Sequence, residues 1–599
     1  MFQDFTVRSA PENGPPRLAA LRAEMAAAGL DGFIVPRADA HQGEYVADCD
    51  ARLGWLTGFT GSAGFCIALG DVAGVFVDGR YRVQVRAEVD LAAFTPVNWP
   101  EVKPGPWLIE ELPAGGHIGF DPWLHAEREI ADLRAALSET GITLVESKNL
   151  VDAIWADRPA PPQAPARIHP AAFAGEESAA KRRRLGAALA AQGAEAAVLT
   201  LPDSIAWLLN IRGNDIPRNP VVLAFAVLHA DGHLTLFADE EKFDAALIAH
   251  LGPEVTLRPI EAFAPGLRSL TGPVLADPAT APLAVFTELG EAGLAMIRAE
   301  DPCLLPKARK NAAEIAGMEA AHLRDAVAMA EFLAWVEAEA PKGALTEIAV
   351  VTALENFRAA TNALLDISFD TICGAGPNGA IVHYRVNEIT NRAVKPGELL
   401  LVDSGAQYID GTTDITRTVA VGPVPEAARD PFTRVLRGMI AIARARWPRG
   451  LAGRDLDALA RAPLWVAGLD YDHGTGHGVG AALCVHEGPA RISRVSAVPL
   501  EAGMILSDEP GYYREGAFGI RIENLVLVEP AQKLGDNRDQ LAFRNLTWVP
   551  IDRRLILAEM LDAEERAWLD AYHADVFARI APHVSPATRD WLESACAPL

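Results

Sequence analysis

The chain has 599 residues, of which 50% are hydrophobic and 22% are charged, and its formal net charge is −25 at pH 7. This is ordinary globular composition, and at roughly 150 residues per domain the length indicates about four domains. The negative charge argues against nucleic acid as a partner, because such a protein needs a basic face to meet phosphates. Residues 1–14 lack the apolar core of a secretory signal, and no run of about 18 apolar residues predicts a membrane span. Six scattered cysteines without a CxxC pair are typical of reduced core thiols, so we expect a cytoplasmic protein.

Two stretches divide the chain into three blocks. Residues 157–166, DRPAPPQAPA, are proline-dense and cannot continue a helix or a central strand, and residues 301–310, DPCLLPKARK, form a weaker break. Blocks one and two each run from a helical segment to an apolar strand, a Trp-Leu motif (WLTGF at 55–59, WLLNI at 207–211) and a further strand. This alternation predicts two α/β domains, and the shared order suggests duplication.

The third block begins with a predicted helix. Its apolar residues recur at three- and four-residue spacings and form one stripe: Ile315, Met318, Ala326, Met329, Leu333 and Val336. Short β runs follow, LLLVDSGAQY and DGTTDITRTVAV, and the Asp410-Gly411 pair between them is typical of a hairpin turn. Ser585-Pro586 is typical of an N-cap followed by proline at the first helical position, so the segment from residue 555 onward is predicted to be helical.

Two carboxylates flank the predicted hairpin. Asp403 ends the apolar strand LLLVDSG, where a carboxylate must be paired, bound to a cation or turned to solvent. Asp414 follows eleven residues later, in the second arm, so the hairpin can bring both carboxylates together. Two carboxylates in one partly buried site repel unless they share a proton or a cation. Of these two, the pattern favours a divalent cation.

The segment HGTGHGVGAALCVHEGP supplies three histidines: His473, His477 and His486. Its glycines allow the backbone to approach a site closely and to adopt unusual dihedral angles. The alternative is a flexible loop with surface histidines, but three of the chain's 14 histidines within this short segment argue against it. Neither GxGxxG nor the Walker spacing is present, so the segment is not a phosphate loop.

Two glutamates complete the candidate set. Glu509 directly follows an apolar run, and Glu523 lies inside the apolar strand pattern GIRIENLVLV. Strand alternation groups Glu523 with Arg521 and Leu525 on one face, which leaves open that Glu523 simply points to solvent. Four carboxylates and one imidazole suit hard or borderline cations such as Mn²⁺ and are too many carboxylates for one closed zinc site. They suit two cations roughly 3.5–4 Å apart, bridged by carboxylate.

The ordered set Asp403, Asp414, His477, Glu509 and Glu523 resembles the ligand pattern of the metallopeptidase family that contains methionine aminopeptidase, prolidase and aminopeptidase P. The strings VDSGAQYIDGTTDITRT, HGTGHGVGAALCVHEGP and EPGYYREGAFGIRIEN look like the long, three-domain, cytosolic aminopeptidases P. The nine-residue spacing from His477 to His486 is wider than in prolidases. WLTGFTGSAG, VDGRY, IWADRP and GMEAAHLRDAVA extend the resemblance over nearly the whole chain.

The resemblance implies a multidomain fold of α/β and α+β parts. Two creatinase-like α/β domains, 1–160 and 161–308, would precede a pita-bread catalytic domain, 309–540, with a helical C-terminal extension, 541–599. It also implies a homodimer. Two divalent metal ions, with Mn²⁺ expected, would be held by the five ligands: Asp403 and Asp414 on one, Asp414 and Glu523 as bridges, and His477 and Glu509 on the second.

The resemblance further implies the reaction, which is removal of the first residue from peptides with proline in second position. A metal-activated hydroxide would attack the carbonyl of residue one, and Glu509 would pass a proton to the proline nitrogen. His383 would support that carbonyl or its tetrahedral intermediate, and His486 would contact the substrate near the proline. Arg80, in VDGRY, would reach the substrate channel, whereas His473 would not be a ligand.

Three alternatives stay open at this point. The first is a metal-free amidinohydrolase of the creatinase type, and the second is a non-catalytic peptide- or histone-binding module; the intact ligand set argues against both. The third is prolidase, restricted to X-Pro dipeptides, against which the histidine spacing and the length argue.

Overall fold

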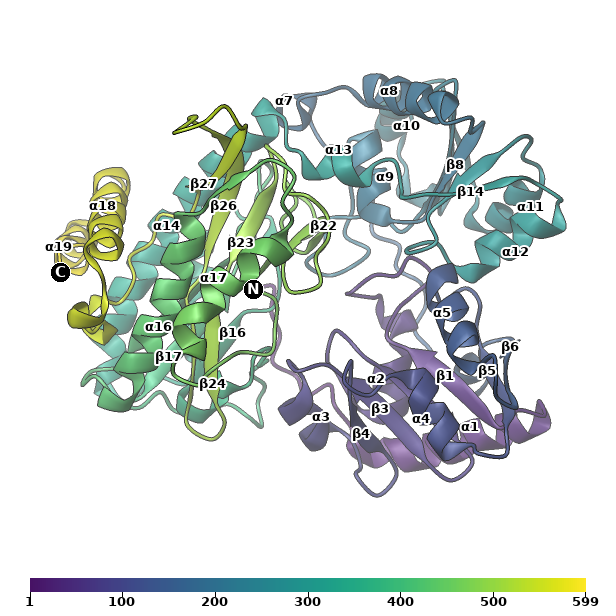
Figure 1. The fold of residues 1–599 in the computed structure, drawn as a ribbon, viewed down its shortest axis with the longest axis horizontal. Coiled ribbons are helices and arrows are strands. Elements are labelled where there is room, and N and C mark those ends of the chain that lie inside the picture. The colour runs from purple at the N-terminus through teal and green to yellow at the C-terminus, as the bar shows by residue number, and fades with distance from the viewer. The chain divides into compact units, whose positions relative to one another are not determined.

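The computed structural model describes residues 1–599 and divides them into two compact units. One is Arg8–Leu304, and the other is Leu305–Leu599 together with Met1–Val7 (Figure 1). The division falls within the weaker of the two predicted breaks. None of the helices combines the length and the hydrophobicity that a membrane span requires, and the six cysteines form no disulfide.

The unit Arg8–Leu304 contains two six-stranded mixed sheets with the same arrangement. Their orders are β4-β3-β2-β1-β5-β6 and β12-β11-β10-β8-β13-β14. In each, the first strand pairs antiparallel with one neighbour and parallel with the other. The bounds are β1 Gly32–Pro36, β2 Phe65–Leu69, β3 Ala73–Val77, β4 Thr95–Asn98, β5 Gly116–Phe120 and β6 Ile142–Glu146, then β8 Ala196–Leu199, β10 Phe225–His229, β11 Leu234–Phe237, β12 Val255–Arg258, β13 Val274–Ala276 and β14 Met296–Arg298. The predicted repeat is therefore present.

The two Trp-Leu motifs occupy equivalent short helices. They lie in α2 (Arg52–Thr57) and α9 (Pro202–Leu209), each of which follows the first strand of its sheet. Helices α1 (Gly14–Ala27) and α8 (Ser178–Ala191) precede those strands. The helix–strand–helix order explains why the same motif recurs at the same place in each block.

The unit Leu305–Leu599 begins with the helix that its apolar stripe predicts. Helix α14 spans Ala312–Glu339, and its N-terminus is closed by a capping box in which Asn311 and Glu314 bond each other's backbone. The stripe is buried, except for the half-buried Ile315. From Ala326 onward it packs on a large apolar core shared with α16 (Glu426–Ala443) and α18 (Ala563–Ile580), whereas Ile315 and Met318 pack in a separate cluster.

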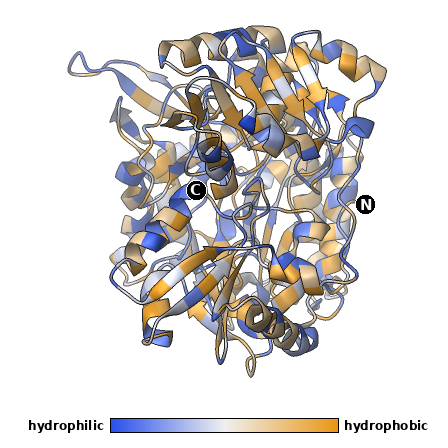
Figure 2. Ribbon diagram, turned by 90° about the vertical axis from the view of Figure 1, so that its right-hand side faces the viewer, coloured by the Kyte–Doolittle hydropathy of each residue, from blue (hydrophilic) through white to orange (hydrophobic).

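Two sheets form the centre of this unit. The smaller has the order β16-β17-β19, and the larger has the order β20-β27-β26-β23-β21-β22. The bounds are β16 Ile372–Ala375, β17 Leu399–Ser404 and β19 Ile415–Ala420, then β20 Arg446–Pro448, β21 Gly476–Gly478, β22 Glu487–Ile492, β23 Ile505–Asp508, β26 Asn524–Ala531 and β27 Gln540–Asn545. Helices α16 and α17 (Gly453–Trp465) pack together beside the larger sheet (Figure 1). Hydrophobic and hydrophilic residues alternate along the helices, as expected where one face is buried (Figure 2).

Two local predictions are confirmed in this unit. Strands β17 and β19 form an antiparallel hairpin, and the Tyr408 N–H donates to the Gly411 carbonyl at its turn, 2.8 Å away. Ser585 caps α19 (Pro586–Ala595) by accepting from the Thr588 N–H, and proline occupies its first position. The terminal segment is helical, as predicted.

Candidate metal centre

The predicted ligands come from segments that the two sheets of the second unit bring together. Asp403 lies on β17 opposite Thr416 of β19, and Asp414 directly precedes β19, so the hairpin places the two carboxylates side by side. His477 lies on β21, and Glu509 directly follows β23, which pairs with β21. The hairpin and the neighbouring strands β21 and β23 of the larger sheet thus supply four of the five side chains.

Glu523 lies between two strands rather than inside one. Strand β25 (Phe518–Arg521) belongs to a small hairpin with β24 (Gly511–Arg514), and β26 begins at Asn524 in the larger sheet. The expectation of one continuous strand was wrong, because the chain changes sheets at Ile522 and Glu523. The Glu523 N–H donates to the Thr416 carbonyl, and the Thr416 hydroxyl donates to its carboxylate at 2.7 Å. With 1% of its surface exposed, Glu523 does not point to solvent, and that alternative is wrong too.

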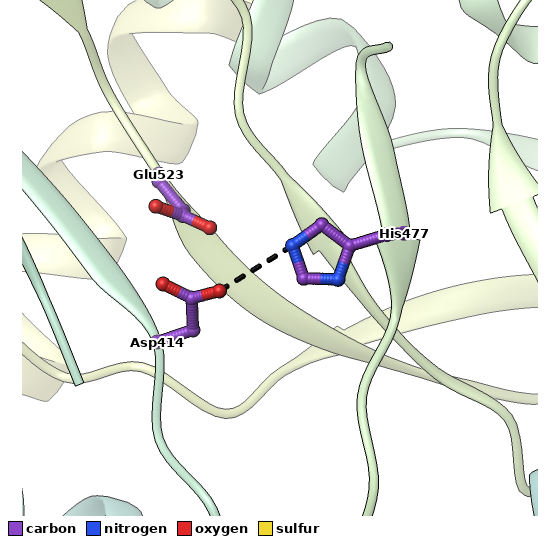
Figure 3. Close-up of side chains that lie close together, drawn as sticks. All are labelled: Asp414, His477 and Glu523. Carbon is purple, nitrogen blue, oxygen red and sulfur yellow. Dashed lines mark ion pairs between the residues drawn. The ribbon is translucent and has the colours of Figure 1, made fainter. Parts of the chain in front are cut away.

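Three side chains converge on one point (Figure 3). Ligand atoms of Asp414, His477 and Glu523 all lie within 4.8 Å of one another. The His477 Nε2 is 3.4 Å from Asp414 Oδ2 and 3.5 Å from Glu509 Oε1. The His477 Nδ1 bonds the Gly478 carbonyl at 3.0 Å, which fixes this nitrogen as the donor and turns Nε2 toward the carboxylates. Histidines that bind metals are held in this way.

Asp403 is held by an arginine that the sequence reasoning did not assign to the site. The Arg521 Nη2 donates to Asp403 Oδ2 at 2.6 Å, and its Nη1 donates to the Tyr513 hydroxyl. That hydroxyl also hydrogen-bonds His473 Nε2 at 2.9 Å. The first histidine of HGTGH therefore supports the predicted ligand Asp403 indirectly, through Tyr513 and Arg521. The available signal was strand alternation, which put Arg521 on the same face as Glu523 in an otherwise apolar segment.

The electrostatics of the cluster fit bound cations. Burial raises the pKa of Asp414 to about 6 and that of Glu523 well above its usual range, and neighbouring carboxylates add to both shifts. Burial lowers the pKa of His477, but its hydrogen bond to Asp414 and the charge of Glu509 outweigh burial and raise it to about 9. Asp403 Oδ1 is buried without a hydrogen-bond partner. Oxygen-rich sites with excess negative charge suit hard divalent ions.

The glycines of HGTGHGVG allow neighbouring backbone segments to lie closer than a side chain would permit. A Cβ on Gly476 would lie 1.9 Å from the Ser507 carbonyl oxygen, and one on Gly478 would lie 2.3 Å from that of Glu487. None of the four glycines has a positive φ, so the expectation of unusual dihedral angles was wrong. His477 lies on a strand, not in the flexible loop of the alternative reading.

The other predicted residues are placed as follows. The His486 ring packs edge-on against the His477 ring, with centroids 4.2 Å apart. His383 is half-buried, and the carbonyl of its neighbour Val382 accepts from Arg521. Arg80 belongs to the unit Arg8–Leu304, where it pairs with Asp78 at 2.7 Å. Its reach to the substrate stays a prediction.

Known proteins match the chain along its length. Residues 17–154 and 157–314 each match a Creatinase/Prolidase N-terminal domain, residues 316–530 match metallopeptidase family M24, and residues 539–599 match the C-terminal region of peptidase M24. Aminopeptidase P2 of Arabidopsis thaliana is 40% identical, and the match covers 95% of this chain and 86% of that protein. The chain belongs to the aminopeptidase P family of metallopeptidases. A probable Xaa-Pro aminopeptidase P of Neosartorya fischeri is 39% identical over 98% of this chain and 93% of that protein.

A solved structure of an X-prolyl aminopeptidase matches nearly the whole chain. The X-prolyl aminopeptidase of Caenorhabditis elegans, described as a cytosolic enzyme with a di-nuclear active site, is 34% identical with a TM-score of 0.92. The match covers 98% of this chain and 99% of that one. The predicted fold class, two creatinase-like domains followed by a pita-bread catalytic domain, is confirmed. As an aminopeptidase P family member, the chain is a metal-dependent hydrolase.

Proposed function

We propose that this aminopeptidase P family member removes the first residue from peptides whose second residue is proline. One observation carries the proposal: Asp414, His477 and Glu523 present their ligand atoms within 4.8 Å of one another, in a chain whose near-full-length relatives are named for this activity. Burying several carboxylates together is unfavourable because each loses its hydration. A binding module without catalysis does not require such a cluster.

Five side chains would hold two divalent cations. The residues that would hold them are Asp403, Asp414, His477, Glu509 and Glu523. Mn²⁺ is the proposed metal, because the ligands are mostly oxygens with a single imidazole. Bound cations would lower the pKa of water so that hydroxide is available near neutral pH.

The chain's own groups position the substrate and move the proton. Glu509 keeps 17% of its side chain exposed and accepts from the Ser507 hydroxyl, so it can take a proton and release it to the proline nitrogen. His383 would donate to the carbonyl oxygen of the first residue as charge develops there. His486, which packs edge-on against His477, would contact the substrate near its proline, and Arg80 would line the substrate channel.

Proline explains both the specificity and the need for this enzyme. Its nitrogen carries no hydrogen and its ring fixes φ, so peptidases that bind the N–H of that residue fail. The acidic cluster would hold the free amine of the first residue, which restricts cleavage to the N-terminus. We expect only the trans X-Pro bond to be cut, since a cis bond directs the chain elsewhere.

The test uses metal-stripped protein with and without Mn²⁺, with Arg-Pro-Pro and Ala-Pro as substrates. Manganese-dependent release of the first residue from the tripeptide, lost in Asp414→Asn, is the expected result. Cleavage of the dipeptide alone would make the enzyme a prolidase. Absence of both metal binding and cleavage would leave the peptide-binding alternative.

We also propose a cytoplasmic homodimer. The C-terminal end of α17 and the segment near residue 495 expose apolar side chains, with Trp465 44%, Val466 80% and Val495 87% exposed. The Arg494 guanidinium lies 5.7 Å from the centre of the Trp465 ring and connects the two segments. Light scattering of wild type and Val466→Asp tests it: a dimer that the variant weakens is expected, and a monomeric wild type would refute it.

A further inference from the structure

The segment that carries His383 has little regular structure. After the short 3₁₀ helix Gly376–Ala380, no helix or strand occurs until β17 begins at Leu399. A catalytic side chain on such a segment needs side-chain contacts to hold it, because hydrogen bonds of a helix or sheet do not. The buried carboxylate of Glu347 provides several of these contacts.

Glu347 is the first residue of α15 (Glu347–Ala359) and has 0% of its surface exposed. Its Oε1 accepts from the Ala375 N–H at 2.8 Å and from the Asn378 amide at 3.0 Å. Its Oε2 accepts from the Tyr384 hydroxyl at 2.9 Å and from the Arg392 N–H at 3.2 Å. These donors sit at both ends and in the middle of the segment 375–392. One carboxylate therefore connects four points of the chain on both sides of His383.

One of these contacts is made by Tyr384, the residue next to His383. The Tyr384 side chain is 4% exposed, and its hydroxyl also accepts from the Asn378 amide at 2.8 Å. On the other side of His383, the Val382 carbonyl accepts from Arg521, the arginine that holds Asp403. His383 is thus held between a contact to Glu347 and a contact to the predicted metal centre.

We propose that Glu347 is a positioning residue for His383 and acts through the Tyr384 hydroxyl. The inference rests on the proposed function of His383 at the scissile carbonyl. A displacement of about 1 Å in a group that stabilises a transition state can cost on the order of 10²-fold in rate, even when the altered residue never touches substrate. Loss of the Glu347 contacts would allow such a displacement of His383.

Two variants and a matched control test the proposal. Tyr384→Phe removes one hydroxyl. Glu347→Gln replaces the carboxylate with a neutral amide that keeps only one acceptor oxygen. Ile389→Ala alters a residue of the same segment that is 78% exposed. With Arg-Pro-Pro and saturating Mn²⁺, we expect kcat to fall about 10-fold in Tyr384→Phe and up to about 100-fold in Glu347→Gln. KM and bound metal should stay within about twofold of wild type, because an interaction made only in the transition state is lost. The control should match wild type.

A double-mutant cycle separates positioning from general stabilisation. If Tyr384 acts through His383, Tyr384→Phe should have no further effect in a His383→Ala background. The same fold-loss in both backgrounds, or a loss of metal in parallel with kcat, would overturn the proposal.

Amide hydrogen exchange gives a readout that does not depend on activity. Glu347→Gln should speed exchange in Gly376–Arg392 and leave α14 unchanged, and equal exchange in variant and wild type would overturn the proposal. If wild type released nothing from Arg-Pro-Pro, the proposed function would fail by itself, while exchange would still decide whether Glu347 orders the segment.

Discussion

Arg521 places a buried positive charge beside the carboxylates of the candidate centre. It is 2% exposed and donates to Asp403 from one nitrogen and to Tyr513 from another. Groups that orient metal ligands typically contribute 10- to 100-fold in metal affinity. We therefore expect Arg521→Gln to weaken Mn²⁺ binding by roughly that factor, measured by titration calorimetry. Arg514→Gln, at an exposed position of the same hairpin, is the control, and equal affinity in both variants would contradict the assignment.

His573 is a buried histidine away from the centre. It is 0% exposed, accepts from the Ile551 N–H at 3.1 Å, and burial with nearby Arg417 lowers its pKa to about 3. The unfolded chain binds this proton near pH 6.5, so the stability that neutral His573 contributes is present above pH 6.5 and is lost as pH falls toward 3. Between pH 6.5 and 5 the loss is about 1.5 kcal/mol.

His573→Gln should reduce the loss of stability between pH 6.5 and 5 by about the 1.5 kcal/mol that His573 contributes. Urea unfolding in EDTA at the two pH values measures it without a contribution from metal release. His583→Gln, at an exposed position, is the control and should keep the wild-type difference. The same pH difference in both variants would show that His573 does not cause it.

At the scale of elements, the β17–β19 hairpin is held by two arginine–aspartate pairs that differ in burial. Arg358 and Asp325 form two bonds of 2.9 and 3.0 Å with side chains 0% and 5% exposed. Arg358 also donates to the Gly405 carbonyl, between the two predicted ligands of the hairpin. Arg324 and Asp410 form the second pair at the turn, where the arginine is 28% exposed.

The difference in burial predicts that breaking the two pairs lowers the free energy of unfolding by different amounts. Asp325→Asn leaves a buried guanidinium without its anion and should lower the free energy of unfolding by about 3–5 kcal/mol. Asp410→Asn leaves Arg324 partly in water and should cost about 1 kcal/mol. Denaturant titrations of both variants check this. Equal losses would mean that burial does not set the strength of these pairs.

The elements that the sequence predicted are those with a local signal. Residues close together in the sequence determine three of them: the hairpin at Asp410-Gly411, the apolar stripe of α14 and the cap at Ser585. The break before Glu523 was missed because it arises from a change of sheet, which depends on partners far along the chain. The same reason hides Glu347, whose four donors lie 28 to 45 positions away. The metal ligands could be predicted from residue types, but the residues that hold them and His383 in place, such as Arg521 and Glu347, could not.

At the scale of the whole molecule, all five predicted metal ligands lie in one of the two compact units. Asp403, Asp414, His477, Glu509 and Glu523 belong to Leu305–Leu599, and the duplicated sheets of Arg8–Leu304 contribute none. A ligand that binds only the folded form stabilises by about 2.7 kcal/mol at 100 times its Kd. Metal binding should therefore act on one unit and leave the other unchanged.

Calorimetry of the metal-stripped protein should show two transitions, of which excess Mn²⁺ raises only one. Asp325→Asn identifies the transition of Leu305–Leu599, because it lowers the stability of that unit alone, and this should be the transition that Mn²⁺ raises. In Asp414→Asn the shift on adding Mn²⁺ should be largely lost, while the other transition stays in place. One transition that shifts as a whole would mean that the two units unfold together and that the energy of metal binding is shared across the chain.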